Sequence, residues 1–179
     1  MFVAKYLTKA KRLTLTLKQH FDLHEYQSKD LMRSYGILVQ RGAIATTPED
    51  AERIARELNT KEDLILKAQV HAGGRGKGTL SSGLKGGVQI VRTPQEIKEL
   101  TAKMLGYNLV THQTTKDGLR VDAVLVHEGV DIKRQIYLAF LLDRNTQGPI
   151  VVASTKGGMD IEEIAKEDPQ AIKVYPFSI

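Results

Sequence analysis

The chain has 179 residues, of which 41% are hydrophobic and 26% are charged, and it contains no cysteine. This composition is typical of a globular protein and excludes disulfides and thiolate chemistry, and no apolar run approaches the roughly 20 residues of a membrane-spanning helix. The net charge of +5 comes from the first 20 residues, so the remaining 159, with 21 basic and 21 acidic side chains, lack the positive excess of a nucleic-acid-binding domain.

The first 21 residues have the composition of a mitochondrial targeting segment. They are rich in lysine and threonine, lack acidic residues, and contain scattered apolar residues such as Phe2, Leu7 and Leu13. A secretory signal would need a continuous apolar core of 7 to 15 residues, which is missing here. We therefore predict a targeting segment over residues 1–21 and a location in the mitochondrial matrix. A disordered basic tail is the alternative.

The next elements are a helix, a strand and a second helix. The first helix is predicted over residues 22–36, with Asp22 as N-cap, Glu25 closing a capping box, and Gly36 as the stop. Residues 37–45, "ILVQRGAIA", alternate briefly and predict a strand. The second helix is predicted over residues 46–59, because Thr47 is a good N-cap and Pro48 suits the first helical position.

Strands and helices continue to alternate to the end of the chain. The apolar patterns predict strands at residues 63–70, 86–92, 123–130, 136–144 and 149–155, and a helix at 93–106. A last helix is predicted to begin at Asp160, with Glu163 in a capping box and Pro169 as its end. Residues 173–179 resemble a strand or turn without a partner, so we expect the sequence to end inside a domain. The fold class is α/β or α+β.

A glycine-rich segment follows the strand at residues 63–70. Residues 67–79 read "KAQVHAGGRGKGT". Glycines allow close approach to the backbone N–H groups, and Arg75 and Lys77 add cationic donors, so the segment suits a phosphate. A surface turn is the alternative. The two common phosphate motifs are excluded, because Thr79 stands where a Walker loop needs lysine and where a dinucleotide fingerprint needs glycine.

Five blocks in order give the sequence a family resemblance. They are "LHEYQSKDLMRSYGI", "LKAQVHAGGRGKG", "SGLKGGV", "GYNLVTHQT" and "DRNTQGPIVVASTKGGMDIEEIA". Together they resemble the β subunits of succinate–CoA ligases, whose N-terminal part has the ATP-grasp fold. The resemblance implies an α+β fold with a first ATP-grasp lobe over residues 22–125. It places the hinge and an incomplete second lobe in residues 126–179.

The resemblance also implies which residues contact a nucleotide. Lys67 matches the family's strand lysine, and Gly74, Arg75 and Gly76 match its nucleotide-contacting Gly-Arg-Gly. We therefore expect Lys67 and Arg75 to bind phosphates, with the glycine-rich segment as a mobile loop that closes over them.

The hinge is expected to contact the nucleobase. Either His127 or Glu128 occupies a position where the family often has glutamate, and the register between the two stays open. Gln135 stands where the family commonly has a nucleotide-contacting glutamate, so a charge-assisted hydrogen bond is replaced by a neutral one.

The resemblance implies a cofactor and partners as well. They are ATP or GTP with Mg²⁺, an α subunit that carries a phosphohistidine, and CoA and succinate as substrates. The family's Mg²⁺ ligands are expected beyond Ile179, so this chain by itself is expected to be inactive, with no catalytic residue of its own. The alternatives are a β subunit of a related acyl-CoA synthetase, such as malate–CoA ligase, and a non-catalytic fragment that binds nucleotide or the α subunit.

The histidines are expected to serve other roles than the phosphohistidine. His71 adjoins the glycine-rich segment and is predicted either to support phosphate binding or to pack at a strand end. His24 and His112 are predicted to be packing or surface residues.

Overall fold

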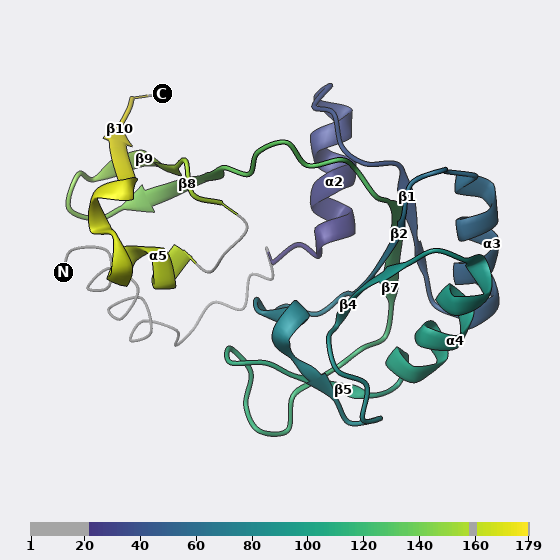
Figure 1. The fold of residues 1–179 in the computed structure, drawn as a ribbon. Coiled ribbons are helices and arrows are strands. Elements are labelled where there is room, and N and C mark those ends of the chain that lie inside the picture. Colours follow the sequence, from purple (N-terminus) through teal and green to yellow (C-terminus); the bar gives the residue numbers. More distant parts are fainter. Residues whose placement is uncertain (1–21, 158–160, 179) are drawn as a thin grey trace. The chain divides into compact units, whose positions relative to one another are not determined.

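The computed structural model describes residues 22–157 and 161–178, so the predicted targeting segment lies outside the described residues. The described residues form two compact units that divide after Asp131. The predicted boundary of the first ATP-grasp lobe, at residue 125, stays a prediction. The class is α+β, with helices and antiparallel sheets (Figure 1). Within the described ranges no helix has the length and apolar character to cross a membrane.

The first unit is built on a four-stranded antiparallel sheet in the order β1-β7-β2-β4. Its strands are β1 (Gly42–Ala45), β2 (Leu64–Ala68), β4 (Val88–Val91) and β7 (Val124–Glu128). Helices α3 (Pro48–Leu58) and α4 (Pro94–Met104) cover one face, and α2 (Glu25–Ser34) lies on the opposite side (Figure 1). The core between the sheet, α3 and α4 contains Ile54, Leu66, Ile97, Val124 and Val126.

Helices α3 and α4 begin as predicted. The Thr47 hydroxyl accepts a hydrogen bond from the Asp50 backbone N–H at 3.1 Å. At α4 the Thr93 hydroxyl accepts from the Glu96 N–H, and the Glu96 carboxylate accepts in return from the Thr93 N–H, each at 3.2 Å. Both caps therefore satisfy backbone donors that the first turn of a helix leaves unpaired.

Helix α2 does not begin as predicted. Its N-cap is His24 instead of Asp22, and the Gln27 side chain accepts from the His24 backbone N–H at 2.9 Å. Glu25 is the first helical residue, and its carboxylate binds two cationic side chains instead of closing a capping box. The Glu25 carboxylate binds the charged donors and not the backbone N–H, because charge-assisted hydrogen bonds are stronger than bonds from a neutral N–H. Gly36 follows the helix with φ +75, as expected of a helix stop.

The structure shortens one predicted strand markedly and adds three short strands. Residues 37–41 are irregular, so the strand predicted over 37–45 is confined to β1. A second sheet in the order β3-β5-β6 consists of β3 (Thr79–Leu80), β5 (Asn108–Val110) and β6 (Leu119–Arg120), none of which the sequence analysis predicted. Strands of two or three residues are too short to show an alternating pattern.

The second unit is a three-stranded antiparallel sheet with one helix. Strands β8 (Tyr137–Asp143), β9 (Gly148–Ser154) and β10 (Ile172–Pro176) lie in the order β10-β9-β8. Helix α5 (Ile161–Glu167) and the short helix η3 (Pro169–Ala171) connect β9 to β10. The core consists of Ile150, Val152, Ile164 and Ile172. The last predicted strand thus has a partner, because β10 pairs with β9. Asp160, the predicted N-cap of α5, lies outside the described residues.

Candidate functional site

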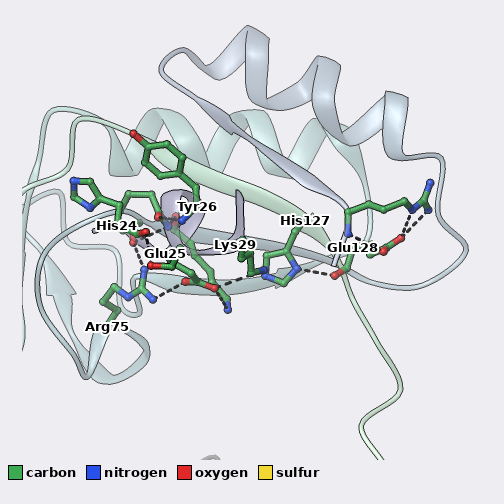
Figure 2. A network of polar contacts seen from close by, with 12 residues as sticks. His24, Glu25, Tyr26, Lys29, Arg75, His127 and Glu128 are labelled. Atoms are coloured by element: carbon green, nitrogen blue, oxygen red, sulfur yellow. Dashed lines mark hydrogen bonds and ion pairs between the residues drawn. The ribbon is translucent and has the colours of Figure 1, made fainter. Parts of the chain in front are cut away.

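A cluster of one acid and three cations joins α2, β2 and the glycine-rich segment. We call Glu25, Lys29, Lys67 and Arg75 the Glu25 cluster (Figure 2). One Glu25 oxygen lies 2.9 Å from the Lys67 Nζ atom, and the other lies 2.7 Å from an Arg75 guanidinium nitrogen. Lys29 is more distant, with its Nζ atom 3.7 Å from Glu25 Oε1. The fold therefore brings together Lys67 and Arg75, which the sequence analysis had assigned to phosphate binding.

The Glu25 cluster is mostly shielded from water. The side chains of Glu25, Lys67 and Arg75 are each 20–24% exposed. Burial alone raises the pKa of Glu25, but hydrogen bonds from Arg75 and Lys67 outweigh it and lower the pKa to about 2. Burial also lowers the pKa of Lys29. Glu25 is consequently ionised at neutral pH and holds its two cationic partners as an ion pair.

The fold fixes Arg75 at both its side chain and its backbone. A second guanidinium nitrogen donates to the Ala68 carbonyl oxygen at 2.7 Å, at the end of β2. The Arg75 carbonyl oxygen accepts from the backbone N–H groups of Gly78 and Gly87 at 3.1 and 2.7 Å. Residues 75–77 form the short helix η2. In this state the glycine-rich segment is thus anchored to β2 and to the start of β4.

Two glycines of the segment differ in what surrounds them. Gly74 has φ +71, and a Cβ atom built there would lie 2.4 Å from the His112 ring. Gly76 has open space, with no heavy atom within 4 Å of such a Cβ.

The backbone N–H groups of residues 74–76 donate to no acceptor within residues 22–157 and 161–178. Three consecutive available donors beside a guanidinium form a site of the kind that holds phosphates.

An open depression of about 590 Å³ adjoins this segment. It is lined by His24, Glu25, His71, Gly73 and Arg75 among others. The rings of His24 and His71 stack with centroids 3.9 Å apart. Burial, the neighbouring His71 and Arg75 lower the pKa of His24. Within the described residues His71 is therefore a ring-stacking partner at the edge of the depression.

His127 and Glu128 end strand β7 and have separate partners (Figure 2). His127 is only 5% exposed, and one ring nitrogen, Nδ1, lies 2.7 Å from the Glu128 carbonyl oxygen. Because a carbonyl can only accept, Nδ1 carries the proton, and burial lowers the pKa of the ring to about 4. The Nε2 atom of His127 is buried with no hydrogen-bond partner in the described chain. The Glu128 carboxylate instead pairs with Arg41 at 2.7 Å.

Of these two residues, His127 lies nearer the Glu25 cluster. It lines a second cavity of about 150 Å³ together with Tyr26, Lys29, Gly42 and Ile44. Lys29 and His127 lie beside each other in Figure 2, and the charges of Lys29 and Lys67 contribute to the lowered pKa of His127. A neutral imidazole with an unpaired acceptor nitrogen is suited to accept a hydrogen bond from a ligand.

Lowering the pH from about 6.5 to 4 is expected to reduce the free energy of unfolding through His127. The fold favours the neutral ring, so this contribution is complete above the ordinary pKa of 6.5 and is lost as the pH falls toward 4. The shift corresponds to roughly 3 kcal/mol at most. His24 acts in the same direction. Urea unfolding at pH 7 and pH 4.5 measures the loss.

The matched pair His127→Gln and His112→Gln isolates this contribution. His127→Gln should show a smaller drop in stability between the two pH values than the unchanged chain. His112 is exposed, so His112→Gln should keep the original drop. If both variants show the same drop in the free energy of unfolding between pH 7 and pH 4.5, the pH dependence does not come from His127.

The remaining predicted residue, Gln135, belongs to the second unit. It precedes β8, where its backbone packs against Gly157, since a Cβ at Gly157 would lie 2.8 Å from the Gln135 carbonyl carbon. Among the described residues no group of three or more acidic or histidine side chains is arranged to hold a metal ion.

Sequence reasoning missed Glu25 and Lys29 as parts of the site. Glu25 is 42 residues from Lys67 and 50 residues from Arg75, so no local spacing links them. The available signal was the pairing of Glu25 and Lys29 at i,i+4, which places both on one face of α2. That pattern is also typical of an ordinary surface ion pair.

Comparisons with known proteins agree on the domain type. The ATP-grasp domain family matches residues 22–179. The mitochondrial GDP-forming succinate–CoA ligase β subunit of Mus musculus is 50% identical over 158 residues, which are 88% of this chain and 36% of the relative. The hydrogenosomal ADP-forming β subunit of Neocallimastix frontalis is 49% identical over 162 residues, 90% of this chain and 37% of the relative.

A solved structure gives the same architecture at low sequence identity. The dinucleotide-forming acetyl-coenzyme A synthetase 1 of Ca. Korarchaeum cryptofilum matches with a TM-score of 0.59 and 18% identity, over 98% of this chain and 66% of the solved chain. At this identity the likeness concerns the fold alone. The chain spans little more than a third of the length of the curated relatives above.

Proposed function

This chain belongs to the ATP-grasp domain family, and we propose that it is the nucleotide-binding part of a succinate–CoA ligase β subunit. The observation that carries the proposal is the meeting of Lys67 and Arg75 beside the available backbone donors of residues 74–76. Cationic side chains and available backbone N–H groups are donors of the kind that bind the phosphates of nucleotides.

Each part of the site has a role in nucleotide binding. Lys67 supplies a point charge on a rigid strand, and Arg75 supplies a planar group with several donors. Residues 74–76 supply N–H groups that a phosphate can approach closely, because two of the three are glycines. We propose that His127 or Glu128, at the end of β7, contacts the nucleobase, because the family often has glutamate at this position. Gln135 is proposed as a further nucleotide contact, as a neutral counterpart of glutamate.

We propose that the full complex catalyses the reaction for which the relatives are named, the ligation of succinate to CoA. Succinate, CoA and a nucleoside triphosphate would give succinyl-CoA, the diphosphate and phosphate, in a complex with an α subunit. Both ADP-forming and GDP-forming relatives are 48–50% identical to this chain, so overall identity does not distinguish ATP from GTP. Mg²⁺ would accompany the phosphates of the nucleotide.

Calorimetry of the 179-residue chain with ATP and with GTP tests nucleotide binding. We expect binding that Arg75→Ala weakens roughly tenfold, the loss of one charge-assisted contact. Lys61→Ala removes the same charge at an exposed position and should leave the affinity unchanged. The absence of binding by either nucleotide, or equal effects of the two variants, would contradict the proposal.

We also infer that residues 1–20 direct the protein to the mitochondrial matrix. The support is their basic, acid-free composition and the mitochondrial β subunits among the relatives. A fluorescent reporter fused to residues 1–30 should accumulate in mitochondria. A variant segment with its five lysines and arginines replaced by glutamine should leave the reporter cytosolic. Cytosolic fluorescence with the unchanged segment would overturn the inference.

A further inference from the structure

The phosphate-binding cations of this chain already hold an anion of the protein itself. Both carboxylate oxygens of Glu25 are used, one by Lys67 and one by Arg75. Three different elements supply these residues, namely α2, β2 and η2. We propose that Glu25 is an internal counter-ion of the phosphate site, which the phosphates of an incoming nucleotide replace. The inference rests on the proposed function, since it concerns the same two cations.

The charge of the Glu25 cluster explains why the empty site needs this carboxylate. Lys29, Lys67 and Arg75 are largely buried cations that share one acidic neighbour. Without Glu25, three positive charges would face one another in a poorly solvated region, where like charges repel strongly. The carboxylate therefore keeps the cations in place while no ligand is bound.

The geometry favours exchange over simple addition of a ligand. Glu25 and Arg75 line the same open depression, so an anion that enters there meets the carboxylate and the guanidinium together. A phosphate close to Arg75 would then lie close to a carboxylate that is ionised at neutral pH, and the two would repel. Glu25 is the first residue of α2, and its flexible side chain borders the depression. Its carboxylate can thus turn away without a change in the helix backbone.

The variant Glu25→Gln tests the exchange directly, because it removes the charge and keeps the size. Its affinity for inorganic pyrophosphate is expected to rise roughly threefold to tenfold, the effect of removing one screened like charge near the ligand. The gain should increase from inorganic phosphate to pyrophosphate to ATP, and adenosine should show none. Glu62→Gln loses the same charge at an exposed position and should leave all these affinities unchanged.

Stability measurements on the same variants give a second readout. Glu25→Gln should melt at a lower temperature than the unchanged chain when empty, because its cations repel. Pyrophosphate should raise its melting temperature by more than it raises that of the unchanged chain. A residue with a merely structural role would lower the melting temperature without this larger shift.

A spectroscopic titration covers the case in which Glu25→Gln does not fold. In the unchanged chain, the ¹³C resonance of the Glu25 carboxyl carbon should move as pyrophosphate binds, and it should stay constant with adenosine. A constant resonance at saturation with pyrophosphate would overturn the proposal, and so would equal or weaker pyrophosphate binding by Glu25→Gln. In both cases ATP binding by the unchanged chain would leave the proposed function standing. Failure of the unchanged chain to bind either ligand would overturn both.

Discussion

Lys67→Met is expected to weaken ATP binding roughly tenfold to a hundredfold and to preserve the fold. Methionine matches the aliphatic stem of lysine, so the contacts of that stem on its face of β2 are largely retained. The variant loses a charge-assisted contact worth about 1.5–3 kcal/mol, and each 1.4 kcal/mol corresponds to about tenfold in affinity. Glu25 keeps Arg75 as a partner, so only a small loss of stability is expected. Calorimetric titration and thermal unfolding measure the two effects.

Lys103→Met is the matched control for this variant. Lys103 is exposed on α4 and loses the same charge on substitution. ATP affinity and its salt dependence should remain as in the unchanged chain, whereas Lys67→Met should show a weaker salt dependence, because ionic screening acts on charges that are present. Unchanged ATP affinity in Lys67→Met would show that Lys67 serves only as the partner of Glu25.

Gly74→Ala is expected to destabilise the chain by about 2 kcal/mol and to impair ATP binding. A non-glycine residue at φ +71 is strained, at a cost of about 1–3 kcal/mol. The added Cβ would also lie within 2.4 Å of the His112 ring, so the segment must shift. The donors of residues 74–76 and the Arg75 backbone would move with it. Urea unfolding and calorimetry measure both consequences.

Gly76→Ala is the control that separates backbone strain at Gly74 from the effect of adding a methyl group to the glycine-rich segment. Its Cβ meets no heavy atom within 4 Å, so the free energy of unfolding should change by no more than about 0.5 kcal/mol. Any loss of ATP affinity in Gly76→Ala would then come from the methyl group next to the ligand. Equal destabilisation by the two alanines would contradict the assignment of strain to Gly74.

Local signals in the sequence were sufficient for most of the fold. Thr47–Pro48 and Thr93–Pro94 marked two helix starts that the structure confirms, because a cap acts within three residues of its own chain. The short strands β3, β5 and β6 were missed for the opposite reason. They are stabilised by pairing with segments distant in sequence, and their two or three residues are too few to show a pattern.

The pattern of residues predicts a strand lysine followed by a glycine-rich segment with an arginine, and the order of motifs indicates an ATP-grasp fold. The tertiary structure alone decided that Glu25 leaves its expected capping role and binds both Lys67 and Arg75. It also decided that His127 is buried and neutral, with the Glu128 carboxylate turned to Arg41. The physical reason is that ion pairs and burial depend on distances through space, which the fold sets between residues 42 to 87 positions apart.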